Sequence, residues 1–174
     1  MNTANKLTMI RVLMIPAFLA VLYIGFPGSH YVAMGIFIAA GLTDFADGYI
    51  ARRCNQVTDF GKLTDPLADK ILVLAAMLWF LEKGIMPAWL VFIVITREFM
   101  VTALRLIAVS NGRVIAAAMS GKVKTVVTMI CLTALFLDLR EWMILVCVAA
   151  IAATTLISGI EYFVKNRDLL NWKK

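Results

Sequence analysis

Four aspartates in a short part of an otherwise apolar sequence are the residues best suited to chemistry. Asp44 and Asp47 are three positions apart, and Asp65 and Asp69 are four positions apart. On a helix, either spacing places both carboxylates of a pair on one face. An ionised carboxylate within a membrane costs about 2.5 to 3.5 kcal/mol, so four of them together require cations nearby. The pattern therefore predicts a cation site shared by two helices.

The fixed cations near these acids, Lys70 and Arg52, can neutralise two carboxylates at most. We expect divalent metal to neutralise the others, and oxygen ligands without histidine or thiolate favour Mg²⁺ or Mn²⁺ over zinc or copper. Magnesium binds through few carboxylates together with water and phosphate oxygens, which indicates a phosphate-bearing substrate. Two other interpretations remain open at this point: a structural network of ion pairs, and the lining of a cation pathway.

The composition indicates that these acids lie in a membrane protein. Of the 174 residues, 62% are hydrophobic and 16% are charged, whereas about 25% of the residues in a soluble domain are charged. Six apolar blocks approach the roughly 20 residues that a membrane-spanning helix needs. The blocks are residues 9–25, 31–51, 65–81, 87–109, 123–138 and 141–163. We therefore expect an all-α polytopic membrane protein with six transmembrane helices and a single domain, residues 1–174.

The basic residues predict the orientation of these spans. Twelve lysines and arginines fall on the side of the two termini, and only Lys83 and Arg140 fall on the other. Because cytoplasmic segments collect basic residues, both termini should be cytoplasmic, with the acids near the inner face of the cell membrane. The net charge of +6 is then explained by contact with anionic lipid headgroups, and we expect no nucleic-acid partner.

Cysteine and histidine exclude several classes of site. Cys54, Cys131 and Cys147 are scattered along the chain, so the sequence predicts neither a disulfide framework nor a zinc site. The single histidine, His30, falls in the predicted outer loop, far from the acids. A Ser/His or Cys/His nucleophile is therefore not expected.

The acids belong to a longer pattern, Asp44-x2-Asp47-Gly48-x2-Ala51-Arg52-x8-Gly61-x3-Asp65-x3-Asp69. This pattern resembles the signature of the CDP-alcohol phosphatidyltransferase family at all eight of its defining positions. Physically, Gly48, Ala51 and Gly61 leave room for a nucleotide to approach the backbone. Arg52 offers a planar donor fork to a phosphate.

The resemblance implies roles for individual residues. Asp44, Asp47 and Asp65 would hold one metal ion, and Asp44, Asp65 and Asp69 a second, with Asp69 also acting as general base. Gly48, Ala51, Arg52, Thr58 and Gly61 would contact CDP-diacylglycerol. Asn5 and Thr8 resemble a further contact of this kind, although a helix N-cap would use the same residue types. The family also implies a homodimer.

Basic residues in the second half of the chain bear on the acceptor alcohol. Arg97 and Arg105 interrupt an apolar block, and Lys122 and Lys124 open the next one. Arginine within a membrane span is by default a functional hypothesis. With Glu98 and the Gly-Lys-x-Lys-Thr segment, these residues resemble the branch of the family whose acceptor is glycerol 3-phosphate. On that resemblance, Arg97, Arg105, Lys122 and Lys124 would bind the acceptor phosphate.

Three alternatives remain at this stage. The same chemistry could use another acceptor, such as serine, inositol phosphate or phosphatidylglycerol. The acids could instead belong to a divalent-cation transporter or a non-catalytic membrane module. The basic residues could be cytoplasmic anchors, with Arg97 paired to Glu98, although adjacent helix positions do not face each other.

Overall fold

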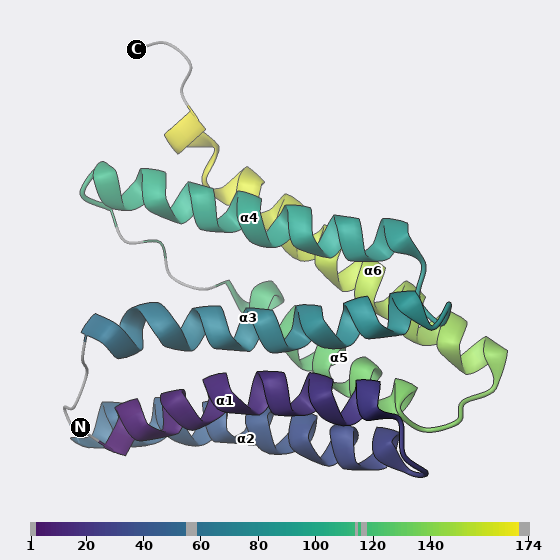
Figure 1. The fold of residues 1–174 in the computed structure, drawn as a ribbon. Coiled ribbons are helices and arrows are strands. Elements are labelled where there is room, and N and C mark those ends of the chain that lie inside the picture. Colours follow the sequence, from purple (N-terminus) through teal and green to yellow (C-terminus); the bar gives the residue numbers. More distant parts are fainter. Residues whose placement is uncertain (1–2, 55–58, 114, 116–117, 171–174) are drawn as a thin grey trace. The chain divides into compact units, whose positions relative to one another are not determined.

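The computed structural model describes residues 3–54, 59–113, 115 and 118–170, and the side chains of most of them. In these ranges the chain forms six α-helices and one short 3₁₀ helix, without a strand. The elements are α1 (Thr3–Ile24), α2 (Ser29–Cys54), α3 (Asp59–Glu82), α4 (Ala88–Ser110), α5 (Met119–Leu135), α6 (Glu141–Lys165) and η1 (Arg167–Leu170). The expected all-α fold with six long helices is confirmed (Figure 1).

Each helix covers one of the apolar blocks, with shifts at the ends. The largest shifts are at the starts of α1 and α3, which each begin six residues before the predicted block. α5 begins at Met119 and ends at Leu135 rather than spanning residues 123–138. The break between α1 and α2 depends on Gly25 and Gly28, which have φ angles of 69° and 83°. Side chains with a Cβ rarely adopt this region, so glycine allows the chain to reverse within four residues.

The chain divides into two compact units. The first contains Met1–Trp79 with Phe136–Asp138, and the second contains Phe80–Leu135 with Leu139–Lys174. The predicted aspartates all belong to the first unit, and the predicted acceptor residues all belong to the second. The single domain expected from the sequence stays a prediction.

Aromatic side chains hold the first unit together. Phe136 lies at the centre, with its ring 6.0 Å from Phe18 of α1, 6.1 Å from Phe37 of α2 and 6.0 Å from Trp79 of α3. Phe18 and Phe37 also contact each other at 6.0 Å. Pairs at such separations stabilise beyond the area they bury. This aromatic cluster therefore fixes the three helices at a common level.

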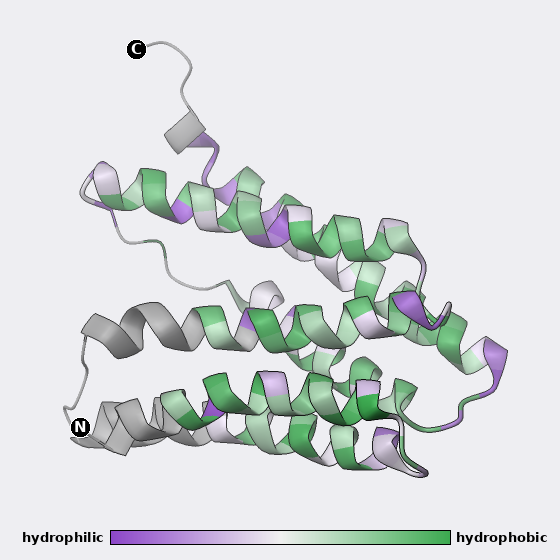
Figure 2. Ribbon diagram, in the orientation of Figure 1, coloured by the Kyte–Doolittle hydropathy of each residue, from purple (hydrophilic) through white to green (hydrophobic). Residues whose placement is uncertain are grey.

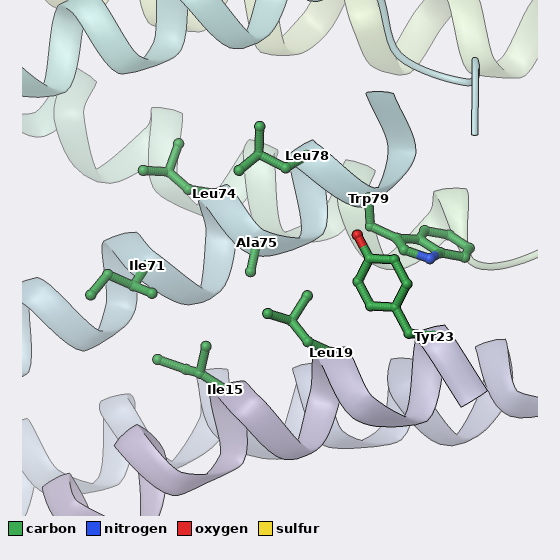
Figure 3. A pocket seen from close by; sticks show the side chains of 8 residues that line it. All are labelled: Ile15, Leu19, Tyr23, Ile71, Leu74, Ala75, Leu78 and Trp79. Carbon is green, nitrogen blue, oxygen red and sulfur yellow. The ribbon is translucent and has the colours of Figure 1, made fainter. Parts of the chain in front are cut away.

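An apolar cavity of about 330 Å³ lies between α1 and α3 in the first unit. Figure 3 shows Ile15, Leu19 and Tyr23 of α1 facing Ile71, Ala75 and Trp79 of α3. Tyr23 and Trp79 lie beside each other at one end, and Ile15 and Ile71 lie at the other. Its lining is almost entirely hydrocarbon, which suits an apolar occupant.

In the second unit, α6 packs against both α4 and α5. The buried side chains of α6 recur every three or four residues: Val148, Ile151, Thr155, Ser158 and Tyr162. The buried side chains of α4 have a similar spacing apart from one gap, between Val94 and Val101. Arg97 and Glu98 lie in this gap. This is the helical stripe expected at a packed interface. Polar residues thus replace aliphatic ones in one part of that interface.

Large apolar side chains cover much of the outer surface. Leu13, Phe92, Phe99, Leu106 and Leu145 are each at least 65% exposed, and Figure 2 shows hydrophobic colouring along most helices. Water-exposed proteins rarely present so much apolar surface, whereas lipid would solvate it. Among the described residues, α6 is the one helix long and apolar enough to cross a membrane.

The other predicted crossings stay predictions. Shorter apolar helical stretches occur at Met9–Ile24 and Ser29–Thr43. In α4, any stretch of about 18 residues contains Arg97, Glu98 and Arg105, so this helix is not uniformly apolar. Its charges are partly buried within the second unit rather than spread over its surface, as described below.

Replacing Phe136 tests the aromatic cluster. Phe136→Ala should lower the free energy of unfolding by about 3 kcal/mol, because Phe136 is 3% exposed and three rings would lose their common contact. Leu137→Ala is the matched control, since Leu137 is 44% exposed and should cost far less. Thermal unfolding in detergent measures both, and equal effects of the two changes would contradict the assignment.

Candidate active site

The helices place the four aspartates of the sequence pattern in two antiparallel elements of the first unit. Asp44 and Asp47 lie in the second half of α2, and Asp65 and Asp69 lie in the first half of α3. Their side chains lie outside the described part of the chain. The positions of their backbones are nevertheless informative.

The aromatic cluster contacts α1, α2 and α3, so the distance of each residue from it along its own helix can be compared. Asp44 and Asp47 follow Phe37 by seven and ten residues, which is about 10 and 15 Å of helix. Asp69 precedes Trp79 by ten residues, which again is about 15 Å, and Asp65 lies about 6 Å further on. All four positions are therefore at the same end of the first unit, and Asp47 and Asp69 are at nearly the same level.

A buried arginine lies at this level as well. Arg11 of α1 is 1% exposed and is among the largest fully buried side chains of the described residues. It precedes Phe18 by seven residues, just as Asp44 follows Phe37 by seven, and those two phenylalanines are in contact. Arg11 is one of the twelve basic residues that fall on the side of the two termini, and its side chain is buried rather than exposed.

The remaining residues of the predicted CDP-diacylglycerol site are placed only in part. Gly48, Ala51 and Arg52 lie in the last turns of α2, and Gly61 lies near the start of α3. Thr58 lies outside the described residues. Asn5 and Thr8 lie within α1, which begins at Thr3, so neither is the N-cap residue that the alternative required.

The second unit contains a buried ion network built around Glu98. One oxygen of its carboxylate, Oε1, accepts hydrogen bonds from Lys124 Nζ and from Arg97 Nη1, both at 2.8 Å. The side chains of Lys124, Arg97 and Glu98 are 7%, 13% and 17% exposed. Ion pairs with this little solvent are screened weakly. Glu98 thus holds two cations, from α4 and α5, at one place.

Two glycines make room for Arg97. A Cβ added at Gly159 of α6 would lie 3.3 Å from Arg97 Cγ, and one added at Gly121 of α5 would lie 3.5 Å from Arg97 Nη2. The arginine side chain therefore runs from α4 past α6 to the first turn of α5. The former contact is tighter than ordinary van der Waals packing, so a larger residue at 159 would require Arg97 to shift by a few tenths of an ångström.

Arg105 is held by a different residue of α6. Its Nε donates a hydrogen bond of 2.8 Å to the hydroxyl oxygen of Tyr162, and its guanidinium carbon is 5.5 Å from the centre of the tyrosine ring. Tyr162 is 2% exposed and packs with Val101 and Leu104 of α4. Arg105 itself is exposed. A rigid, buried phenol thus anchors an arginine that reaches solvent.

One expectation requires correction. Adjacent residues do pair here: Arg97 contacts Glu98 because packing between α5 and α6 confines both long side chains and Lys124 draws the carboxylate to the same place. The last helix, α6, also contributes to this site, since it supplies Gly159 and Tyr162. Lys122, by contrast, is exposed at the start of α5. Of the four predicted acceptor residues, Arg97 and Lys124 are brought together through Glu98.

The sequence contained a signal for the residues that were missed. The buried stripe of α6 changes from Val148 and Ile151 to Thr155, Ser158 and Tyr162 as it approaches the C-terminal end. Small and hydroxyl-bearing residues on the packed face of an apolar helix indicate polar partners on the facing helix. Arg11 gave a weaker signal, because a basic residue in the first turns of a helix is usually a surface anchor.

Comparisons with known proteins identify the family. Residues 1–157 match the model of the CDP-alcohol phosphatidyltransferase family. The chain is 39% identical to the CDP-diacylglycerol–glycerol-3-phosphate 3-phosphatidyltransferase of Bacillus subtilis, with 97% of each chain covered. It is 38% identical to the enzyme of the same name from Shigella flexneri, with 98% of each chain covered.

A third relative, the probable phosphatidylglycerophosphate synthase of Mycobacterium tuberculosis, is 38% identical over 92% of this chain and 79% of its own length. The family match and these relatives extend over both compact units, including the helices that carry the aspartates and those that carry the basic residues. The chain therefore belongs to the CDP-alcohol phosphatidyltransferase family.

Proposed function

We propose that this chain transfers the phosphatidyl group of CDP-diacylglycerol to glycerol 3-phosphate and releases CMP and phosphatidylglycerophosphate. Similarity over 97% of both chains to a relative named for that reaction carries the proposal. The resemblance of the sequence pattern to the family signature supports the same reaction, and so does the ion network of the second unit.

The charges of the second unit suit a phosphate-bearing acceptor. Arg97, Lys124 and Arg105 contribute three positive charges and Glu98 one negative charge, which leaves a surplus of two. A phosphate monoester carries about −1.5 to −2 charges near neutral pH. An acceptor without net charge, such as the zwitterion serine, would leave this surplus unbalanced. Lys122, which is exposed at the start of α5, would add a further cation.

The aspartates of the first unit suit the phosphatidyl donor, CDP-diacylglycerol. We infer that Asp44, Asp47, Asp65 and Asp69 hold two Mg²⁺ or Mn²⁺ ions, which would offset charge on the pyrophosphate. The common level of these positions and the oxygen-only donor set support this assignment. Gly48, Ala51, Arg52, Thr58, Gly61, Asn5 and Thr8 would contact CDP-diacylglycerol. The apolar cavity between α1 and α3 would accommodate hydrocarbon of the lipid.

Asp69 would serve as the general base. It would accept the proton of the acceptor hydroxyl as that oxygen attacks the phosphorus bearing diacylglycerol, while the bond to CMP breaks. Arg11 adds a fixed positive charge at the level of the acids. We infer that it offsets part of the negative charge of the carboxylates.

The membrane arrangement follows from the same assignments. We propose six membrane crossings, both termini in the cytoplasm and an active site facing the cytoplasm, where the soluble acceptor is available. The charged group in α4 is compatible with a crossing because Glu98 neutralises part of it. A homodimer, which the family resemblance implies, completes the proposal.

The alternatives predict different behaviour. The same chemistry with serine would use the acids but would leave the surplus charge of the second unit unbalanced, whereas inositol phosphate and phosphatidylglycerol are anionic and would balance part of it. A divalent-cation transporter would need the acids and no lipid substrate. The family match over residues 1–157 favours the enzyme.

An acceptor panel tests the proposed reaction. Purified protein with CDP-diacylglycerol and Mn²⁺ should release CMP when glycerol 3-phosphate is added and at least about tenfold more slowly with serine or glycerol, because one lost ionic contact already costs this factor. CMP release is measured directly by chromatography. Equal rates with glycerol 3-phosphate and serine would contradict the acceptor assignment.

Replacing Asp69 tests the proposed base. Asp69→Asn should lower the rate at saturating substrates by at least about 100-fold, because an amide cannot accept the proton. The folded state should persist, as judged by gel filtration and thermal unfolding in detergent. Asp138→Asn, an exposed carboxylate in the loop between α5 and α6, is the matched control and should retain full activity. Near-normal turnover of Asp69→Asn would show that the base lies elsewhere.

A further inference from the structure

Two arginines on α4 that are far apart along their own helix contact a single turn of α6. Arg97 and Arg105 are eight residues apart, which is about 12 Å along α4. Their α6 contacts, Gly159 and Tyr162, are only three residues apart, or about 4.5 Å. The two side chains therefore converge on one place at the α4–α6 interface.

We propose that Gly159 and Tyr162 are positioning residues for recognition of the acceptor phosphate: Gly159 leaves the space in which Arg97 lies, and Tyr162 orients Arg105. This inference rests on the proposed function and extends it to α6, which bears neither the aspartates nor the predicted acceptor residues. The turn between Gly159 and Tyr162 acts as a platform that sets the distance between two guanidinium groups.

The hydrogen bond to Tyr162 determines which edge of Arg105 is presented. Because Nε is engaged by the phenol oxygen, the edge formed by the two terminal nitrogens is the one that a phosphate meets. A guanidinium binds two phosphate oxygens through such an edge only when its plane is fixed. Tyr162 is able to fix it, since its ring is 2% exposed and packs against Val101 and Leu104.

Gly159 acts by its lack of a side chain. A Cβ added at Gly159 would lie 3.3 Å from Arg97 Cγ. Arg97 Cγ would have to shift by a few tenths of an ångström, and the same side chain donates the hydrogen bond to Glu98. Lys124 shares the same oxygen of Glu98, so the displacement would reach the second cation of the network.

The test uses the purified full chain in detergent micelles, with CDP-diacylglycerol, Mn²⁺ and glycerol 3-phosphate. Tyr162→Phe keeps the ring and its packing but removes the oxygen that Arg105 contacts. We expect the KM for glycerol 3-phosphate to rise about three- to tenfold, with little change in kcat, because the phosphate contact is made equally in the ground state and the transition state. The KM for CDP-diacylglycerol should not change.

Gly159→Ala should raise the KM for glycerol 3-phosphate in the same selective way. The matched controls are Tyr31→Phe, which removes the hydroxyl of a half-exposed tyrosine in α2, and Gly35→Ala, which adds a Cβ where nothing lies within 4 Å. Both controls should leave each KM unchanged. In an Arg105→Gln background, Tyr162→Phe should have no further effect on KM, since it acts through that arginine.

The outcomes separate the two proposals. If the unmodified protein releases CMP no faster with glycerol 3-phosphate than with serine, the proposed function fails and this inference fails with it. If it uses glycerol 3-phosphate but Tyr162→Phe leaves the KM for that substrate unchanged, only the positioning role is overturned. A rise in both KM values together with a lower unfolding temperature would show a structural role and would also overturn it.

Discussion

The structure depends on the cost of enclosing charge among apolar helices. Each ionised group there needs an opposite charge or a polar partner, because no other contact offsets the free energy of its desolvation. In the second unit this requirement is met by Glu98, which accepts hydrogen bonds from the buried cations of Lys124 and Arg97. In the first unit, buried Arg11 lies at the level of the aspartates.

The two units divide the proposed chemistry between them. The first carries the acids, the buried arginine and an apolar cavity, which together suit a lipid-linked diphosphate and divalent ions. The second carries a cationic group with a surplus of two positive charges, which suits a small phosphate-bearing acceptor. In the second unit the polar residues extend a helical stripe that is otherwise aliphatic or aromatic. Packing there fixes the positions of Arg97, Glu98 and Lys124 at the same time as it forms the core.

Much of this organisation could be predicted from the sequence, and the exceptions share a cause. Helix positions followed from the apolar blocks, and the acids were identified because Asp44 and Asp69 belong to a pattern with fixed spacing. The pattern of one helix does not reveal which residue of another helix faces it. Gly159 and Tyr162 looked like ordinary members of α6, and Arg11 looked like a surface anchor, until tertiary packing placed the first two against arginines and buried the third.

The dependence of catalysis on divalent metal tests the central claim most directly. The purified protein should be chelated until its metal content, measured by mass spectrometry, is far below the protein concentration, and CMP release should then be followed as Mg²⁺ or Mn²⁺ is restored. The account predicts that activity disappears on chelation and returns with either ion. Turnover that persists in the metal-depleted protein would contradict it.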